Sequence, residues 1–248
     1  MRLAVMQPYF FPYLGYFSLI AATDQFVVFD PVQYIRRGWM NRNRILKPDF
    51  ATPQYIGVPI VKQSRDVIIR DTKITNDSNW QRRLVAQFQH YKKRAPHFIN
   101  VMKLLQQCFK FKTESLVELN VHCLQVVCET LEIDFRSTPF ESIERDVEKA
   151  SHAGEWAVNV ARVMNATSYL NPIGGREIFD VKDFNQHDIE LNFIQNRLTR
   201  YCQNNTQFVA GLSILDVMLF NSPQETRNLV DDFVILDAVV QNTPLNQS

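Results

Sequence analysis

The sequence has 248 residues, of which 46% are hydrophobic and 21% are charged, as in globular proteins that form one large domain or two small ones. The formal net charge of +1 gives no indication of nucleic acid or a membrane surface as a partner. No run approaches the ~20 apolar residues that a membrane span requires, and the N-terminus does not resemble a signal peptide, so we expect a cytoplasmic protein without membrane insertion.

The first thirty residues predict a βαβ unit. Residues 3–6 have the pattern of a short buried strand, residues 15–22 that of a helix, and residues 25–29 that of a second buried strand. Elements of this size and order form a parallel strand pair with a right-handed crossover. In such folds ligands collect at the carboxyl ends of the strands, here residues 7–13 and 30–34.

The remaining chain alternates between short strands and longer helices. Strand character appears at residues 55–61 and 67–69, and helical patterns cover residues 80–94, 96–110, 115–131 and 151–164. Two further strands at 169–170 and 189–194 and a helix at 212–220 follow. We therefore predict an α/β fold with an N-terminal half (1–75), an inserted, mainly helical region (76–165), a return that completes the same domain (166–240) and a polar tail (241–248).

The first candidate site is the segment QPYFFPYLGY, residues 7–16. Its two prolines stiffen the loop, and Gly15 lets the helix begin close to a strand or a ligand. The first turn of that helix presents free N–H groups that suit an anion or a phosphate. The phenylalanines are assigned to the core, whereas the predicted substrate-binding residues are Gln7, Tyr9, Tyr13, Gly15 and Tyr16.

The second candidate site is the segment DPVQYIRRGWMNRNR, residues 30–44, which contains four arginines. Arginine forks bind phosphate or carboxylate, and a tryptophan stacks on rings. A solvated basic turn with salt bridges is the alternative, but the position after a buried strand favours ligand binding. We predict catalytic roles for Asp30, Asn41 and Arg42, and substrate contacts for Gln33, Tyr34, Arg37, Trp39 and Asn43.

Two shorter segments complete the candidate site. In NPIGGRE, residues 171–177, paired glycines can expose N–H groups to an anion, although a tight turn has the same pattern; the predicted ligand residues are Asn171, Gly174, Gly175 and Arg176. Asp216 lies within an apolar helix, where a carboxylate is costly to bury unless it is paired. A salt bridge to an arginine of residues 36–44 and a direct ligand contact are the two interpretations.

The sequence offers no pattern for metal chemistry or hydrolytic catalysis. The cysteines, at positions 108, 123, 128 and 202, form no Cys-x-x-Cys pair, which favours buried thiols in a reducing compartment over a zinc site or disulfides. The five histidines are scattered, without a His-x-x-x-His pair or a Gly-x-Ser-x-Gly motif. We predict no metal site.

Together, residues 6–17, 30–44, 169–177 and 212–217 resemble the WbqC-like family, and the resemblance extends from residue 3 to about residue 222. One departure is Pro31, which stands where a second acid is expected after Asp30. The resemblance implies a bacterial protein associated with O-antigen and other surface-glycan gene clusters. It implies the biosynthesis of an unusual sugar more than a particular reaction.

The first segment also resembles, more distantly, the strand–loop–helix of the HIGH-type nucleotidylyltransferases. In those enzymes two histidines contact ATP phosphates where the helix begins, and here Tyr13 and Tyr16 stand in their places. A tyrosine donates a hydrogen bond to phosphate but is neutral, with an ordinary pKa near ~10. This second resemblance implies a nucleotide-binding fold and makes ATP a candidate cofactor.

Three functions remain open at this point. The first is a transferase that places an acyl or aminoacyl group on a nucleotide-activated amino sugar, with Asp30 accepting the proton of the amine and Asn41 or Arg42 stabilising the oxyanion. The second is a nucleotidylyltransferase for a small phosphorylated molecule. The third is a non-enzymatic binding module of a glycan-assembly complex. The expected partner is a nucleotide sugar or another phosphorylated small molecule, and the oligomeric state is left open.

Overall fold

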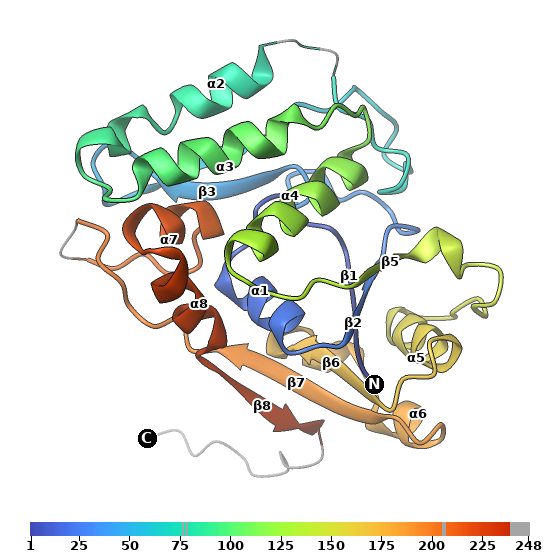
Figure 1. Ribbon diagram of the computed structural model, residues 1–248. Coiled ribbons are helices and arrows are strands. Elements are labelled where there is room, and N and C mark those ends of the chain that lie inside the picture. The colour runs from blue at the N-terminus through green and yellow to red at the C-terminus, as the bar shows by residue number, and fades with distance from the viewer. Residues whose placement is uncertain (76, 78, 205–206, 239–248) are drawn as a thin grey trace.

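A six-stranded sheet organises the computed structural model, which describes residues 1–75, 77, 79–204 and 207–238 (Figure 1). Its strand order is β5-β2-β1-β6-β7-β8. The central strand β1 (Arg2–Met6) pairs in parallel with β2 (Gln25–Val28) on one side and with β6 (Ser168–Pro172) on the other. Strand β5 (Ser137–Pro139) joins β2 in parallel, β7 (Glu190–Asn196) joins β6 in parallel, and β8 (Phe233–Asp237) closes the other edge in the antiparallel direction.

The predicted parallel βαβ unit is confirmed. Helix α1 (Leu14–Ala21) connects β1 to β2, and the two strands pair from Leu3↔Gln25 to Met6↔Val28. Counted along the chain, the six strands lie in the order 3-2-1-4-5-6, which is that of doubly wound nucleotide-binding sheets. The strand order reverses between β1 and β6, so a crevice is expected at the carboxyl ends of these two strands.

Helices cover both faces of the sheet, and the alternation of strand side chains divides the core between them. Ala4 and Val28 face the larger core, which includes α1, α7 (Ile214–Phe220) and α8 (Pro223–Asp231). Leu3 and Val27 face the smaller core, which includes α5 (Ala153–Val163) and α6 (Val181–Asn185) (Figure 1). Neighbouring residues of one strand therefore serve opposite faces of the sheet.

The chain between β2 and β5 contains several helices, but it begins with an unpredicted strand. Strands β3 (Arg42–Leu46) and β4 (Pro53–Gly57) form a separate antiparallel pair, so the arginine-rich segment ends in a strand. Residues 67–69, predicted as a strand, make only an isolated bridge between Ile68 and Gln33. The helix predicted over residues 80–94 is divided into α2 (Trp80–Ala86) and the 3-10 helix η1 (Gln89–Lys93).

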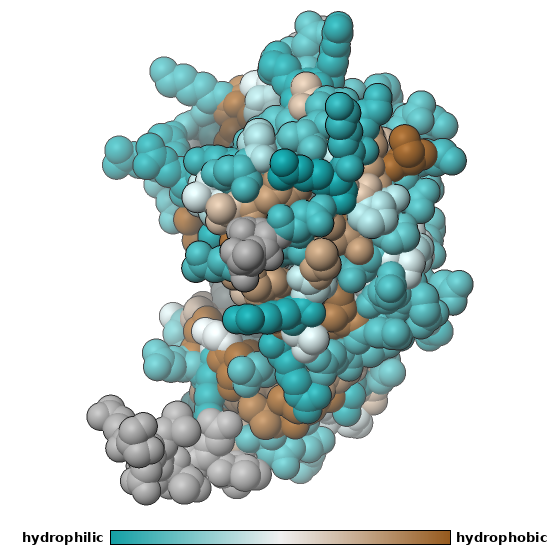
Figure 2. Space-filling view, turned by 90° about the vertical axis from the view of Figure 1, so that its left-hand side faces the viewer, coloured by the Kyte–Doolittle hydropathy of each residue, from teal (hydrophilic) through white to brown (hydrophobic). Residues whose placement is uncertain are grey.

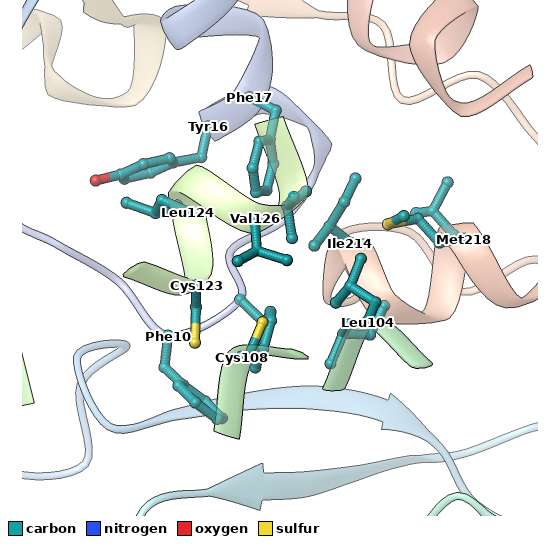
Figure 3. Close-up of a cluster of buried hydrophobic side chains, with 14 of the residues drawn as sticks. Phe10, Tyr16, Phe17, Leu104, Cys108, Cys123, Leu124, Val126, Ile214 and Met218 are labelled. Carbon is teal, nitrogen blue, oxygen red and sulfur yellow. The ribbon is translucent and has the colours of Figure 1, made fainter. Parts of the chain in front are cut away.

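Helices α3 (Phe98–Lys110) and α4 (Leu116–Thr130) follow the predicted positions and bury one face each. In α3, Val101, Leu104, Leu105 and Cys108 recur at helical spacing and are all buried. Figure 3 shows Cys108 beside Cys123 of α4 within this hydrophobic cluster. The thiols are free and buried, as predicted for these two positions.

Several short elements were not apparent in the sequence. Besides β5, α6 and β8, these include the 3-10 helices η2 (Phe140–Ser142) and η3 (Ile173–Ile178), and helix α8. Helix α8 begins with a capping box between Ser222 and Glu225, a sequence signal that was overlooked. The polar tail predicted at residues 241–248 lies outside the described residues. Figure 2 shows a mostly hydrophilic side of the molecule, on which hydrophobic residues gather at the level of β8.

Within the described part of the chain, no helix is both long and apolar enough to cross a lipid bilayer.

Asp216, in the first turn of α7, is completely buried. Its carboxylate accepts hydrogen bonds from the hydroxyls of Tyr91 at 2.5 Å and Tyr201 at 2.8 Å, and from the backbone N–H of Leu46 at 3.2 Å. The salt bridge considered for Asp216 is therefore wrong, because hydroxyl and amide donors take the place of an arginine. Burial raises the pKa of Asp216 from 3.8 to about 6, and the three hydrogen bonds oppose this shift.

The raised pKa of Asp216 predicts a pH-dependent stability that the variant Asp216→Asn lacks. The folded state binds the proton of Asp216 more tightly than the unfolded state does. Protonation of Asp216 therefore adds to the unfolding free energy, and this stabilisation is complete below about pH 4 and is lost as pH rises through about 6. In urea titrations between pH 4 and 6, we expect the unfolding free energy of the wild type to fall, relative to that of Asp216→Asn, by about 1.4 kcal/mol per pH unit. Parallel profiles for the two proteins would contradict this account.

Candidate functional site

The leading candidate site is a cavity of about 610 Å³ at the carboxyl ends of β1, β6 and β7. Gln7 follows β1, Asn171 lies in β6 and Gln195 lies in β7, and all three line the cavity. We call it the switch-point cavity, because it lies where the strand order reverses, the position at which doubly wound sheets bind their ligands. The cavity is lined by residues of the first sequence segment (7–16) and of the third (171–177).

Three helices begin at the wall of the switch-point cavity. Gly15 belongs to the first turn of α1, Ala153 starts α5, and Ile173 starts η3. No side chain caps the first turn of any of the three helices. Because the leading N–H groups of a helix have no partner within it, these turns offer hydrogen-bond donors and positive dipole ends to an anionic group.

Six aromatic and four amide side chains line the cavity together with aliphatic residues and glycines, and no charged residue is among the described residues that line it. Burial raises the pKa values of Tyr9 and Tyr13 above 10, and for Tyr9 the neighbouring Tyr13 adds to the shift. Both phenols therefore stay protonated at neutral pH and can donate hydrogen bonds. This lining suits an uncharged ring that carries hydrogen-bonding groups.

The glycines of the first and third segments make room for specific side chains. A Cβ atom on Gly15 would lie 2.6 Å from Cε2 of Tyr13, so the glycine admits the tyrosine ring over the start of α1. A Cβ atom on Gly175 would lie 2.4 Å from Nδ2 of Asn171, whereas one on Gly174 would meet nothing within 4 Å. Of the two neighbouring glycines, Gly174 therefore faces open space beside the cavity.

Hydrogen bonds from three other segments hold the loop that leads from β1 to α1. Nδ2 of Asn120 donates to the carbonyl oxygens of Pro8 at 2.8 Å and Met40 at 2.7 Å. Nδ2 of Asn43 donates to the carbonyl oxygen of Phe10 at 3.1 Å, and Oγ of Ser213 donates to that of Phe11 at 2.8 Å. The second and fourth segments thus support the first one. Asn43, predicted to bind substrate, is buried and uses its amide in this way.

Tyr16 also acts on this loop. Its ring is 1% exposed and lies in the hydrophobic cluster shown in Figure 3, and its hydroxyl donates to the carbonyl oxygen of Gln7 at 2.7 Å. Burial raises its pKa well above 10. Tyr16 is therefore placed to position Gln7 at the cavity, whereas Tyr9 and Tyr13 themselves line it.

Of the arginine-rich segment, only Ile35 is among the described residues that line the cavity, and the chain after it leads away. Ile35 lines the cavity, Arg37 adopts a positive φ of 61°, and the chain continues into β3. The guanidinium of Arg42 lies 4.1 Å from the ring centroid of Tyr55, and that of Arg44 lies 5.4 Å from the ring of Trp39. Among the described residues no carboxylate pairs with any of the four arginines of residues 36–44, so the alternative of a salt-bridged turn is not observed.

The other polar residues predicted in this segment bond within the surrounding loops. Tyr34 donates its hydroxyl proton to Oδ1 of Asn41 at 2.7 Å, and Asn41 donates to the carbonyl oxygen of Val58 at 2.9 Å. Gln33 donates to the carbonyl oxygen of Arg65 at 2.7 Å. None of these three predicted site residues lines the switch-point cavity.

Asp30 and Arg176 also lie outside the lining of the cavity. Phe29 lines it, but Asp30, the next residue, faces the opposite side of the sheet, where it lines another cavity with Arg70. Burial raises the pKa of Asp30, and the guanidinium of Arg70, 3.1 Å away, opposes the shift. The guanidinium of Arg176 lies 5.9 Å from the ring centroid of Phe193. The catalytic roles of Asp30, Asn41 and Arg42 stay predictions.

Sequence reasoning missed several residues of the cavity. Trp156 comes from α5, Ile35 from the arginine-rich segment, and Leu198, with a positive φ of 50°, from the chain after β7. A helix was predicted at residues 151–164, but without the strand order nothing indicated that its start faces the end of β1. Gly154 was also overlooked, although a Cβ atom there would lie 2.4 Å from the carbonyl oxygen of Ile178.

The close approach of Gly154 to η3 predicts a sharp difference between two glycine substitutions. Gly154→Ala forces the backbones of α5 and η3 apart, and we expect it to lower the unfolding free energy by about 2–3 kcal/mol. Gly174→Ala places its methyl group in open space, and we expect a change within about 0.5 kcal/mol. Urea unfolding of both variants measures the difference, and equal losses would show that the contact at Gly154 does not shape this wall.

Comparison with known proteins identifies the family. Residues 7–228 match the model of the WbqC-like protein family. An uncharacterized protein of Mycobacterium tuberculosis, Rv1507c, is 30% identical over 223 residues, which cover 89% of this chain and 93% of the relative. No solved structure matches the chain. On the extent of these two matches, the chain belongs to the WbqC-like family.

Proposed function

We propose that this protein is a transferase that binds a nucleotide-activated sugar in the switch-point cavity and transfers an acyl or aminoacyl group to the sugar amine, in the biosynthesis of bacterial surface polysaccharide. The observation that carries the proposal is the uncharged, aromatic and amide-lined cavity at the reversal of a 3-2-1-4-5-6 sheet. Its volume of about 610 Å³ lies within the range of small-molecule sites.

The surroundings of the cavity suit the two parts of a nucleotide sugar differently, the rings on the one hand and the phosphates on the other. The aromatic rings suit a base or a sugar, and the amides of Gln7, Asn171 and Gln195 suit hydroxyl groups. The phosphates would lie toward the starts of the three helices and toward Arg36 and Arg37, which follow Ile35 at the cavity wall. Among the described residues no carboxylate pairs with these two arginines, and Nη2 of Arg36 donates to the carbonyl oxygen of Gln63 at 2.8 Å, so a diphosphate would replace a neutral acceptor and not a charged one.

Nucleotidyl transfer is the second candidate, and the absence of a base from the described lining favours it. Acyl transfer to an amine requires a proton acceptor, and the predicted acceptor Asp30 faces the other side of the sheet. The groups that line the cavity can stabilise negative charge, but its phenols do not accept protons at neutral pH. Phosphoryl-type transfer depends mainly on positioning and charge stabilisation, as in the HIGH-type enzymes that the first segment resembles.

The proposal is tested by incubating the protein with nucleotide amino sugars and acyl donors, with and without ATP, followed by mass spectrometry and pyrophosphate detection. A mass gain on the sugar supports acyl transfer, and pyrophosphate release without acylation supports the second candidate. We expect Gln7→Ala to weaken nucleotide-sugar binding about fivefold, the value of one hydrogen bond, and the exposed control Gln106→Ala to leave it unchanged. If no nucleotide sugar changes in mass or raises the melting temperature of the protein, the proposal fails.

Arg37→Gln tests the placement of the phosphates. Because charge-assisted hydrogen bonds are stronger than neutral ones, we expect about tenfold weaker binding of a nucleoside diphosphate sugar and no change for the nucleoside alone. Calorimetric titration at two salt concentrations measures both affinities. Arg82→Gln, which changes an exposed arginine of α2, is the matched control. If Arg37→Gln weakens the binding of the nucleoside as much as that of the nucleoside diphosphate sugar, the phosphates do not lie beside Arg37.

A further inference from the structure

A second cavity, of about 660 Å³, lies on the other face of the sheet. It is bounded by the ends of β2 and β5 and by α4, and we call it the α4 cavity. The alternation of side chains at the end of β2 separates it from the switch-point cavity, because Phe29 lines one and Asp30 the other.

A buried ion pair is built into the wall of the α4 cavity. Asp30 is only 5% exposed, and its Oδ1 lies 3.1 Å from Nη2 and 3.3 Å from Nε of Arg70. Nη1 of Arg70 also donates to Glu144 at 2.7 Å, and the backbone N–H of Arg70 donates to the carbonyl oxygen of Asp30 at 3.1 Å. These contacts fix the position of the carboxylate, two residues after the end of β2.

The charges along this wall do not balance. Arg70 is the one lysine or arginine in the described lining. It already pairs with two carboxylates, those of Asp30 and Glu144. Glu118 and Glu141 add two further carboxylates without a basic partner among the described residues. The charge of Glu141 reaches Asp30, since it adds to the rise in the pKa of Asp30. The excess negative charge favours a cation.

The opposite side of the cavity is apolar and flat. The rings of Phe111 and His122 stack with centroids 4.6 Å apart and an interplanar angle of 25°. Phe111 is 39% exposed, and three valines and Pro139 continue the apolar surface. Nε2 of His122 is enclosed and has no hydrogen-bond partner among the described residues. An apolar body of ligand size would find contacts here.

We propose that the α4 cavity binds a small organic amine, with its ammonium group between Asp30 and Glu141 and its apolar body against Phe111 and His122. This proposal is independent of the function of the switch-point cavity.

Three aromatic probes of similar size, which differ in charge, test the charge preference. Benzylamine, benzyl alcohol and benzoate are titrated into the full-length protein, and the imidazole signals of His122, assigned through His122→Phe, report binding at this site by NMR. We expect benzylamine to bind with a dissociation constant of about millimolar, as an eight-atom fragment should, benzyl alcohol about tenfold more weakly, and benzoate not at all. Equal shifts from amine and alcohol, or none from the amine, would overturn the proposal.

Two substitutions locate the ammonium group. Glu141 is exposed, so Glu141→Gln should leave the fold intact and weaken benzylamine about fivefold at low salt, with a smaller effect at high salt. Glu190→Gln, on an exposed carboxylate of β7 outside the lining, should change nothing. Gln7→Ala, in the switch-point cavity, should leave amine binding unchanged, so that failure of one proposal is distinguishable from failure of the other. Unaltered affinity in Glu141→Gln would exclude this placement.

Discussion

The loop between β1 and α1 depends on hydrogen bonds that its backbone accepts from distant parts of the chain. Its prolines cannot donate, and Phe11 adopts a positive φ of 40°, so the loop has little capacity to hold itself. Carbonyl oxygens at positions 8, 10, 11 and 12 accept from Asn120, Asn43, Ser213 and the backbone N–H of Ile214. These donors fix the end of β1, and with it the position of Gln7 at the cavity.

These hydrogen bonds to the loop explain the structural role of several segments that resemble the family. Asn43 and Ser213 belong to segments that look like ligand-binding motifs in the sequence, yet both side chains are buried and donate to carbonyl oxygens of the loop. Asp216, in the same segment as Ser213, anchors α7 through Tyr91 and Tyr201. The second and fourth segments thus act largely as supports, while residues of the first and third reach the cavity directly.

The alternation of side chains at the end of β2 explains why the carboxyl edge of the sheet carries two separate cavities. Strand side chains alternate between faces, so Phe29 and Asp30 serve different sides although they are adjacent in the chain. Within the described part of the chain, one cavity has an uncharged lining and lies beside arginines that pair with no carboxylate, and the other has an excess of carboxylates. Two chemically different environments therefore arise at one sheet edge without any change in the backbone fold.

The sequence by itself determined the elements whose signals are local. The parallel βαβ unit, the helices near residues 98–110 and 116–130, and the proximity of Gln7 to the end of β1 follow from hydrophobic periodicity, prolines and loop length. Only the tertiary structure decided which side chains share a cavity. It placed Trp156 and Leu198 beside Gln7, removed Asp30 to the other face, and buried Tyr16. The physical reason is that strand order and sidedness come from pairing between distant segments, and a shift of one residue along a strand exchanges the faces of the sheet.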